Sequence, residues 1–274
     1  MTIEQDKILY FANFIKEHLG IIYADANMYQ LEHRLNDICY QLGFKTIDEL
    51  YQNAHIVMTS QMKELILDLA TNNETSFFRD SAMYTALREF VFPELINKTH
   101  KGIIDIWSAA CSSGQEVYSI MMEYQLIKEK NPIVPMLNLL ATDISGTILK
   151  RAKSGTYTQL DVQRGLPAKY LIQFFDKLEN DNWQVKPTLQ RGIDFAKLNL
   201  LENWDSIGTF DVIFCRNVLI YQNIENRIKV IDKIFNKLNS GGFLILGASE
   251  SLLGLSEKFN QVSTSGTIIY QKKA

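Results

Sequence analysis

The stretch from Ile103 to Glu116 limits most strongly what this chain can fold into. A short apolar run opens it, a patch of small side chains follows, and a helical apolar period begins at Val117. This order predicts a buried strand, a tight turn and a helix, with which open α/β sheets hold nucleotide-like cofactors. Small side chains let a ligand approach the backbone, and N–H groups at a helix start can bind its polar groups. Because Gly114 stands alone where dinucleotide folds prefer three glycines, a packed turn without a ligand fits the pattern too.

Composition excludes several classes of protein. The net charge of −3 argues against non-specific nucleic-acid binding, which needs a basic surface. Cys39, Cys111 and Cys215 are widely spaced, so we expect reduced thiols in a cytoplasmic protein and no metal site. The first residues lack the pattern of a signal peptide, and no apolar run approaches the roughly 18 residues of a membrane span. We therefore expect a cytoplasmic protein that does not insert into the membrane.

Residues 1–70 are predicted to form an all-α N-terminal domain, because apolar residues recur at helical spacing and no strand pattern occurs. The region carries a net charge of −5, against −3 for the whole chain, and an acidic helical face is most often simply solvated. The stripes are Tyr10, Phe11, Phe14 and Ile15; Leu31, Leu35, Ile38 and Leu42, ended by Gly43; and Met62, Leu65, Ile66 and Leu69.

Residues 71–80 combine polar turn-forming side chains with Phe77, Phe78 and Arg79. One interpretation is a linker that its phenylalanines anchor to a core, and the spacing favours it. The other is a site at which Arg79 grips a carboxylate in apolar surroundings. The helix predicted next, Met83–Ile96, is expected to break at Pro93.

A second buried strand is predicted at Met136–Thr142, and Asp143 follows it. An acidic residue there commonly binds ribose hydroxyls, but it can also cap the next helix, Ile144–Lys153. Ser145 is an alternative cap that would leave Asp143 available to a ligand.

Residues 156–197 interrupt the α/β alternation. We interpret them as a small antiparallel insertion that includes strands at Trp183–Val185 and Ile193–Phe195. A further buried strand is predicted at Phe210–Cys215, followed by the most regular helical pattern in the chain, Ile224–Leu238. Residues 239–242 are expected to turn into a strand at 243–246, and 267–270 to supply the last strand.

These features resemble CheR-type chemotaxis receptor methyltransferases over essentially the whole chain. The segments that carry the resemblance are Asn73–Arg79 (N-x-T-x-F-F-R), Trp107–Ser119 (W-S-A-A-x-S-x-G-x-E-x-Y-S), Ala141–Ile144, Asn199–Leu201 and Phe214–Tyr221 (F-C-R-N-V-x-I-Y). The resemblance implies a Rossmann-like class I α/β methyltransferase sheet of seven strands at 81–274, with a β-subdomain at about 176–196. The helical domain at 1–70 would precede it, joined by a linker at 71–80 that contributes to the cofactor site.

The resemblance also implies an activity, in which S-adenosylmethionine methylates glutamate side chains on receptor cytoplasmic helices, leaving S-adenosylhomocysteine. Arg79 would pair the carboxylate of the cofactor, and Tyr221 would lie beside the transferring methyl. The remaining cofactor-binding residues would be Asn73 and Thr75 at the amino-acid end, Glu116 at the ammonium, Asp143 at the ribose, Asn199 and Leu200 at the adenine, and Arg216 and Asn217 on the floor.

The residue types suit this chemistry, because a glutamate with a pKa near 4.3 is already ionised at neutral pH and needs no general base. Two alternatives remain open: a methyltransferase with another protein acceptor, and a non-catalytic adaptor that binds the cofactor. The docking helix of the family is often basic, whereas here Leu31–Leu42 balances His33 and Arg34 with Glu32 and Asp37.

The turn at Lys177–Trp183 lacks the glycine of members that tether to a receptor C-terminal peptide. A glycine-free turn adopts positive φ less easily, although Asn180 and Asn182 soften this argument. We therefore expect a tether-independent enzyme. Separately, we expect a monomer.

Overall fold

A computed structural model describes residues 3–23, 27–99 and 102–273. Its centre is a sheet of seven strands, the number that the resemblance implied. The strand order is β6-β2-β1-β7-β8-β10-β9. The strands from β6 to β8 are parallel, and β10 runs antiparallel to both of its neighbours. The strands are β1 (Ile103–Ala109), β2 (Met136–Asp143), β6 (Ile193–Lys197), β7 (Phe210–Cys215), β8 (Leu238–Leu246), β9 (Phe259–Thr264) and β10 (Thr267–Lys272).

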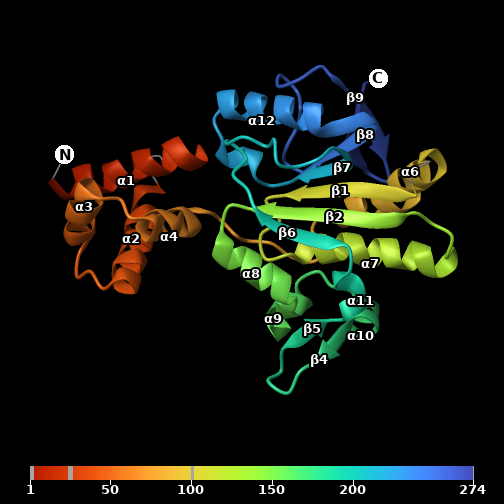
Figure 1. The fold of residues 1–274 in the computed structure, drawn as a ribbon, viewed down its shortest axis with the longest axis horizontal. Helices are drawn as coiled ribbons and strands as arrows, with labels where there is room; N and C mark the ends of the chain where they lie inside the picture. The colour runs from red at the N-terminus through yellow and green to blue at the C-terminus, as the bar shows by residue number, and fades with distance from the viewer. Residues whose placement is uncertain (1–2, 24–26, 100–101, 274) are drawn as a thin grey trace.

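Helices cover both faces of this sheet (Figure 1). Helices α7 (Gln115–Lys130) and α8 (Gly146–Ser154) lie on one face, and α12 (Ile224–Lys237) lies on the other. Because successive side chains of a strand point to opposite faces, Ile106 packs with the α7 side and Trp107 with the α12 side. The apolar strands predicted from the sequence are therefore buried on both faces.

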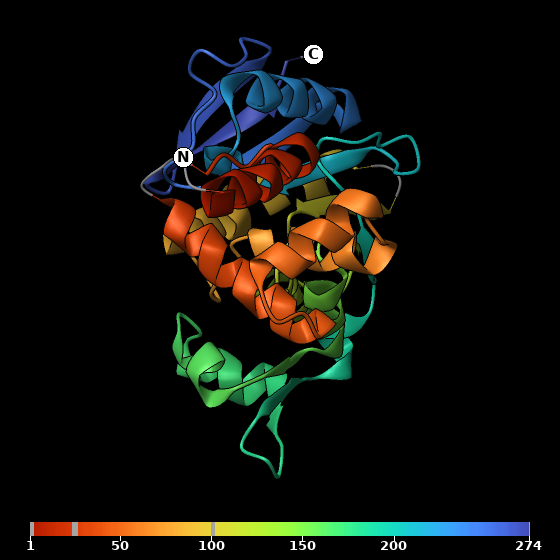
Figure 2. The ribbon, with the colours of Figure 1, turned by 90° about the vertical axis from the view of Figure 1, so that its left-hand side faces the viewer.

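The N-terminal helices form a separate group beside the sheet (Figure 1), and Figure 2 views the molecule from their side. Their helical spacing is confirmed, since Phe11, Leu35 and Ile66 are fully buried in a cluster of their own. Gly43 ends the second helix with φ 78°, a left-handed conformation that glycine adopts without strain. The helices are α1 (Ile3–Leu19), α2 (Met28–Leu42), α3 (Ile47–Ile56) and α4 (Ser60–Ala70).

The predicted break at Pro93 is wrong. Helix α5 (Ser81–Ala86) continues through a π-helical turn, Leu87–Val91, into α6 (Phe92–Lys98). A proline cannot donate the hydrogen bond that its place in a regular helix requires. Here the chain widens into the π turn before the proline, and Val91 and Phe92 keep right-handed helical backbone angles.

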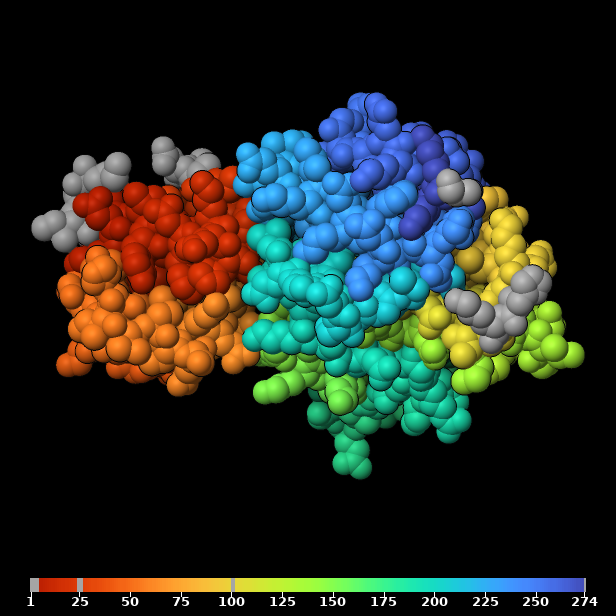
Figure 3. All heavy atoms as spheres, turned by 45° about the horizontal axis from the view of Figure 1, so that its top comes forward, coloured from red at the N-terminus to blue at the C-terminus, as the bar shows by residue number. Residues whose placement is uncertain are grey.

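The insertion differs in extent from the predicted one. Its three-stranded sheet contains β3 (Thr156–Tyr157), β5 (Trp183–Val185) and β4 (Phe175–Lys177), and the β4–β5 hairpin protrudes from the surface (Figure 3). Its helices are α9 (Gln159–Gln163), α10 (Ala168–Phe174) and α11 (Pro187–Gln190). The strand expected at Ile193–Phe195 pairs instead with the edge of β2 in the main sheet, where both apolar side chains pack on the core.

Candidate cofactor and active site

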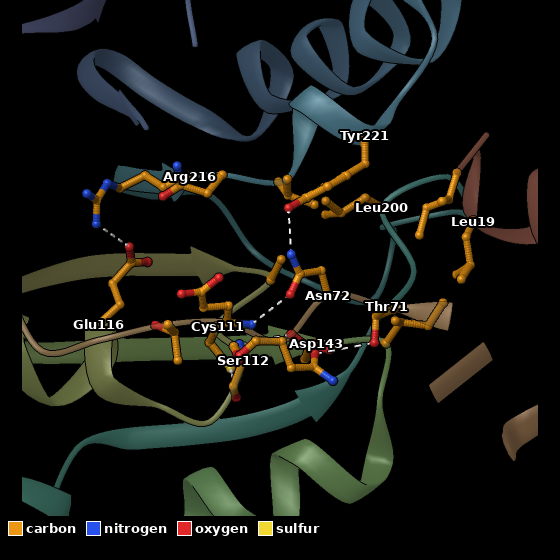
Figure 4. A pocket seen from close by; sticks show the side chains of 18 of the residues that line it. Leu19, Thr71, Asn72, Cys111, Ser112, Glu116, Asp143, Leu200, Arg216 and Tyr221 are labelled. Atoms are coloured by element: carbon orange, nitrogen blue, oxygen red, sulfur yellow. Dashed lines mark hydrogen bonds and ion pairs between the residues drawn. The ribbon is translucent and has the colours of Figure 1, made fainter. Parts of the chain in front are cut away.

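A pocket of about 1000 Å³, counting the open space at its mouth, lies where β1, β2 and β7 end. Every site residue predicted from the sequence lines it: Asn73, Thr75, Arg79, Glu116, Asp143, Asn199, Leu200, Arg216, Asn217 and Tyr221. Figure 4 shows Glu116 and Arg216 at one end, Leu19 and Leu200 at the other, and Asp143 on the floor between them. The pocket therefore has a charged end and an apolar end.

The loop after β1 is held in an unusual conformation. Ala110 and Ser112 have φ values of 62° and 50°, in the left-handed region that non-glycine residues rarely adopt. The end of β2 holds the loop there: Cys111 N donates to the Thr142 carbonyl at 2.9 Å and Ser112 N to Asp143 Oδ2 at 2.9 Å. The small side chains thus keep the backbone exposed to the pocket.

Asp143 is buried beneath this loop. Its second oxygen, Oδ1, accepts a hydrogen bond from Ser145 N at 3.0 Å. Burial raises the pKa of the Asp143 carboxyl, while the N–H groups of Ser145 and Ser112 act in the opposite direction. Ser145 caps α8 by accepting from Ile148 N at 3.1 Å, so the capping alternative for Asp143 is wrong.

A buried ion-pair network forms the charged end. Arg216 Nη1 donates to Glu116 Oε2 at 2.8 Å, and its Nη2 donates to Asp80 Oδ2 and to the Arg79 carbonyl, each at 2.7 Å. Ser108 Oγ donates to Glu116 Oε1 at 2.8 Å. Burial alone would lower the pKa of Arg216, but Glu116, Tyr84 and Asp80 together outweigh burial and the pKa is raised. The network ties β7, α7 and the 71–80 segment together.

The 71–80 segment is anchored by its phenylalanines, as the linker interpretation predicted, and it also lines the pocket. Phe77 and Phe78 are buried against aromatic rings of the core, including Tyr157 and Tyr170. Arg79 remains partly exposed in the pocket and makes one longer hydrogen bond, Nη1 to the Glu74 carbonyl at 3.3 Å. The phenylalanines therefore anchor a segment whose polar residues face the pocket.

Tyr221 lies in a short 3-10 turn, Leu219–Tyr221, and points into the pocket (Figure 4). Its hydroxyl accepts a hydrogen bond from Asn72 Nδ2 at 2.9 Å, and the residue is 39% exposed. Asn72 is not among the site residues predicted from the sequence, although it stands next to Asn73, which is. A polar residue beside a matched motif was the only available signal.

Two side-chain amides join α1 to the pocket wall. Asn199 Nδ2 donates to the His18 carbonyl at 2.8 Å, and Gln222 Nε2 donates to the Leu19 carbonyl at 2.6 Å. These carbonyls belong to the last turn of α1, where no intrahelical donor remains. We name this contact the α1 seam. It places Leu19 and Ile21 in the pocket, a contribution that the sequence analysis missed.

Two further properties concern the parts of the chain that the structure describes. Within 3–23, 27–99 and 102–273, no group of His, Cys, Asp and Glu side chains is arranged to hold a metal ion. Over the same ranges, no helix has the length and apolarity that crossing a membrane requires.

Comparison with known proteins identifies the family. Residues 73–268 match the family described as CheR methyltransferase, SAM binding domain. The chain is 38% identical to the chemotaxis protein methyltransferase Cher2 of Pseudomonas putida, over 96% of each chain. It is 36% identical to chemotaxis protein methyltransferase 1 of Vibrio cholerae, over 100% of this chain and 99% of the relative.

Among solved structures, the N-methyltransferase NodS of Bradyrhizobium japonicum in complex with S-adenosyl-L-homocysteine matches with a TM-score of 0.41. The identity is 14%, over 75% of this chain and 94% of that one. The family match and the full-length relatives lead to one conclusion: the chain belongs to the CheR methyltransferases, enzymes of chemotaxis that use S-adenosylmethionine.

Proposed function

We propose that this enzyme methylates glutamate side chains on the cytoplasmic helices of chemotaxis receptors, giving glutamate methyl esters. The observation that carries the proposal is the hydroxyl of the partly exposed Tyr221, which accepts a hydrogen bond from Asn72 in the pocket. A hydroxyl there can orient an acceptor carboxylate that enters from solvent. The carboxylate is already ionised at neutral pH, so no residue has to act as a base.

The polarity of the pocket supports a specific orientation of the cofactor. S-adenosylmethionine supplies a methyl group that its sulfonium activates for transfer. Its amino-acid group would lie at the charged end with Asn73, Thr75 and Glu116, and its adenine between Leu200 and the neighbouring Asn199. The buried carboxylate of Asp143 suits the ribose hydroxyls. The side chains at each end of the pocket thus match the part of the cofactor assigned to that end.

The two pocket arginines differ in what they can still bind. Among the described residues, Arg216 already contacts Glu116, Asp80 and the Arg79 carbonyl, whereas Arg79 makes one hydrogen bond at 3.3 Å. We therefore assign the cofactor carboxylate to Arg79. Arg216, paired with Glu116 at 2.8 Å, would close the charged end of the pocket together with Asn217. Arg79 and Tyr221 are then the residues nearest to the reacting groups.

Orientation and exclusion of water would supply the rate acceleration. In favourable cases, holding the reacting groups in line contributes roughly 7–11 kcal/mol. The strained 110–114 loop, the buried network at Arg216 and the Asn72–Tyr221 hydrogen bond all restrict motion around the pocket.

The test uses radiolabelled S-adenosylmethionine and purified receptor cytoplasmic fragments. We expect label on the receptor that mild base releases as methanol, and no label when the receptor glutamates are replaced by alanine. Label that appears on another protein would identify a different acceptor. Cofactor binding without transfer to any acceptor would indicate an adaptor.

We propose a cytoplasmic monomer organised as residues 1–70, 71–80 and 81–274. Recruitment through a basic α2 face is not part of the proposal, because Arg34 turns inward and donates to the Ala70 carbonyl at 2.7 Å. His33, also on α2, lies 3.5 Å from Asp37.

We also propose that the enzyme does not need a receptor C-terminal tether. The absence of a glycine from the turn does not support this proposal, because Asp181 adopts a positive φ of 62° there. Two other features support the proposal: β4 offers an edge of only three residues, and Lys177 and Asp181 form a 2.8 Å ion pair across the turn. Calorimetry with a receptor C-terminal pentapeptide should detect no binding. Micromolar binding, or activity lost with the receptor tail, would contradict this.

A further inference from the structure

The carboxylate of Glu250, in the loop after β8, accepts hydrogen bonds from an unusual concentration of backbone N–H groups. Its Oε1 accepts from Val218 at 3.0 Å, Leu219 at 2.8 Å and Ile220 at 3.3 Å. Its Oε2 accepts from Asn217 at 2.7 Å and from Gly247 at 2.8 Å. Converging backbone N–H groups form a concave site for an anion, and here the anion is a side chain of the same protein.

The segment that Glu250 holds is the one that carries Tyr221. Asn217 has φ 57°, and the N–H groups at the start of the Leu219–Tyr221 turn have no partner inside the turn. The carboxylate meets both needs, because it fixes the strained residue and satisfies the orphan donors. Without the Glu250 carboxylate, these N–H groups would hydrogen-bond to water and the 217–221 backbone would leave its strained conformation.

Gly247 leaves room for the contact between Glu250 and the Asn217 backbone. A side chain at position 247 would place its Cβ 2.6 Å from Asn217 Nδ2 and 2.8 Å from Glu250 Oε2, so it would displace one of these two side chains. Glu250 is fixed in turn by its own N–H, which donates to the Gly247 carbonyl at 2.9 Å.

We infer that Glu250 is a positioning residue for methyl transfer, which acts by fixing the Asn217–Tyr221 loop so that the Tyr221 hydroxyl faces the acceptor. The inference rests on the proposed function of Tyr221. Glu250 does not line the pocket, so its effect on the reaction passes through the loop.

The principal test is Glu250→Gln in the full-length protein. The change keeps size and shape but replaces one accepting oxygen with an N–H₂ group that faces backbone donors. Misplacing a reacting group by about 1 Å can cost about a hundredfold in rate, so we expect kcat for receptor methylation to fall about 10- to 100-fold. The affinity for S-adenosylhomocysteine should change less. Glu257→Gln, at an exposed position of the same loop, is the matched control and should keep the wild-type rate.

A double-mutant cycle with Tyr221→Phe separates positioning from general stabilisation. If Glu250 acts through Tyr221, Glu250→Gln should lower kcat much less in the Tyr221→Phe background than in the wild type. Equal fold losses in the two backgrounds would overturn the inference, and so would wild-type kcat in Glu250→Gln.

Hydrogen exchange of the backbone amides at 217–220 tests the contact without any activity measurement. We expect faster exchange in Glu250→Gln and in Glu250→Ala, and no change in Glu257→Gln. Unchanged protection in Glu250→Gln would overturn the inference even if the wild-type protein methylates no receptor fragment. A wild-type protein that methylates no receptor fragment would refute the proposed function alone. Failure of the inference and failure of the proposed function are therefore distinguishable.

Discussion

Replacing Glu116 by glutamine tests the buried network at the charged end of the pocket. The Arg216 side chain is 3% exposed and that of Glu116 is 11% exposed, and their atoms Nη1 and Oε2 lie 2.8 Å apart. Glu116→Gln keeps the volume and one accepting oxygen but leaves the guanidinium without its most buried counter-ion. The free energy of unfolding should therefore fall.

The structure sets the size of this loss. Removing one partner of a buried ion pair costs about 3–5 kcal/mol, because the other charge stays buried. Arg216 keeps Asp80, which is 33% exposed, and the Arg79 carbonyl, so we expect roughly 2–4 kcal/mol. In a chain of this size each kcal/mol lowers the melting temperature by about 2–4 °C.

The assay is urea unfolding of the cofactor-free protein, followed by tryptophan fluorescence. Asp232→Asn is the matched control, because its 2.7 Å pair with Lys258 has side chains about half exposed. Such a surface pair contributes about 0–1 kcal/mol. If Glu116→Gln destabilises the protein no more than Asp232→Asn, burial does not give the Arg216 network its stability and the reasoning fails.

Three further predictions concern the pocket. Asp143→Ala should weaken S-adenosylhomocysteine binding at least tenfold by calorimetry, since each charge-assisted hydrogen bond contributes about 1.5–3 kcal/mol. Because burial raises the pKa of Asp143, wild-type affinity should fall on acidification from a higher pH than an ordinary aspartate would give, and the alanine variant should lack that fall. Tyr221→Phe should lower kcat more than cofactor affinity, whereas Arg79→Ala should lower both. If Tyr221→Phe keeps the wild-type turnover, the tyrosine contributes only packing. Gln222→Ala removes the hydrogen bond to the Leu19 carbonyl, and a loss of about 1 kcal/mol should weaken cofactor binding several-fold; unchanged affinity would mean that the α1 seam does not shape the pocket.

Much of the fold could be predicted because the central strands are buried on both faces. The apolar runs at 103–107, 136–142 and 210–215 predicted β1, β2 and β7, and the pocket lies at their ends. The strands toward the edge of the sheet gave weaker sequence signals. Strand β9 buries only Phe259 and leaves its other residues exposed or half-buried, so its sequence resembles a polar loop. The turn expected at 239–242 is part of β8, beside a shift in register with β7.

The residues that sequence reasoning missed act on distant backbone groups. Gln222 bonds to a carbonyl 203 positions away in the chain, and Glu250 bonds to donors about 30 positions away. Nearly every residue carries a backbone carbonyl and an N–H group, so no sequence motif identifies which one a side chain will bind. Asn72 was missed for another reason, since its contact with Tyr221 depends on how the 71–80 segment packs.

The α1 seam limits how modular this enzyme can be. The helical region has its own core and resembles an exchangeable unit, yet Leu19 and Ile21 form part of the pocket wall. A chimera that took its helices from a relative would import a foreign surface into the pocket and would need side chains matching Asn199 and Gln222 to receive it. In this enzyme, recombination at residue 70 therefore exchanges part of the pocket wall along with the helices.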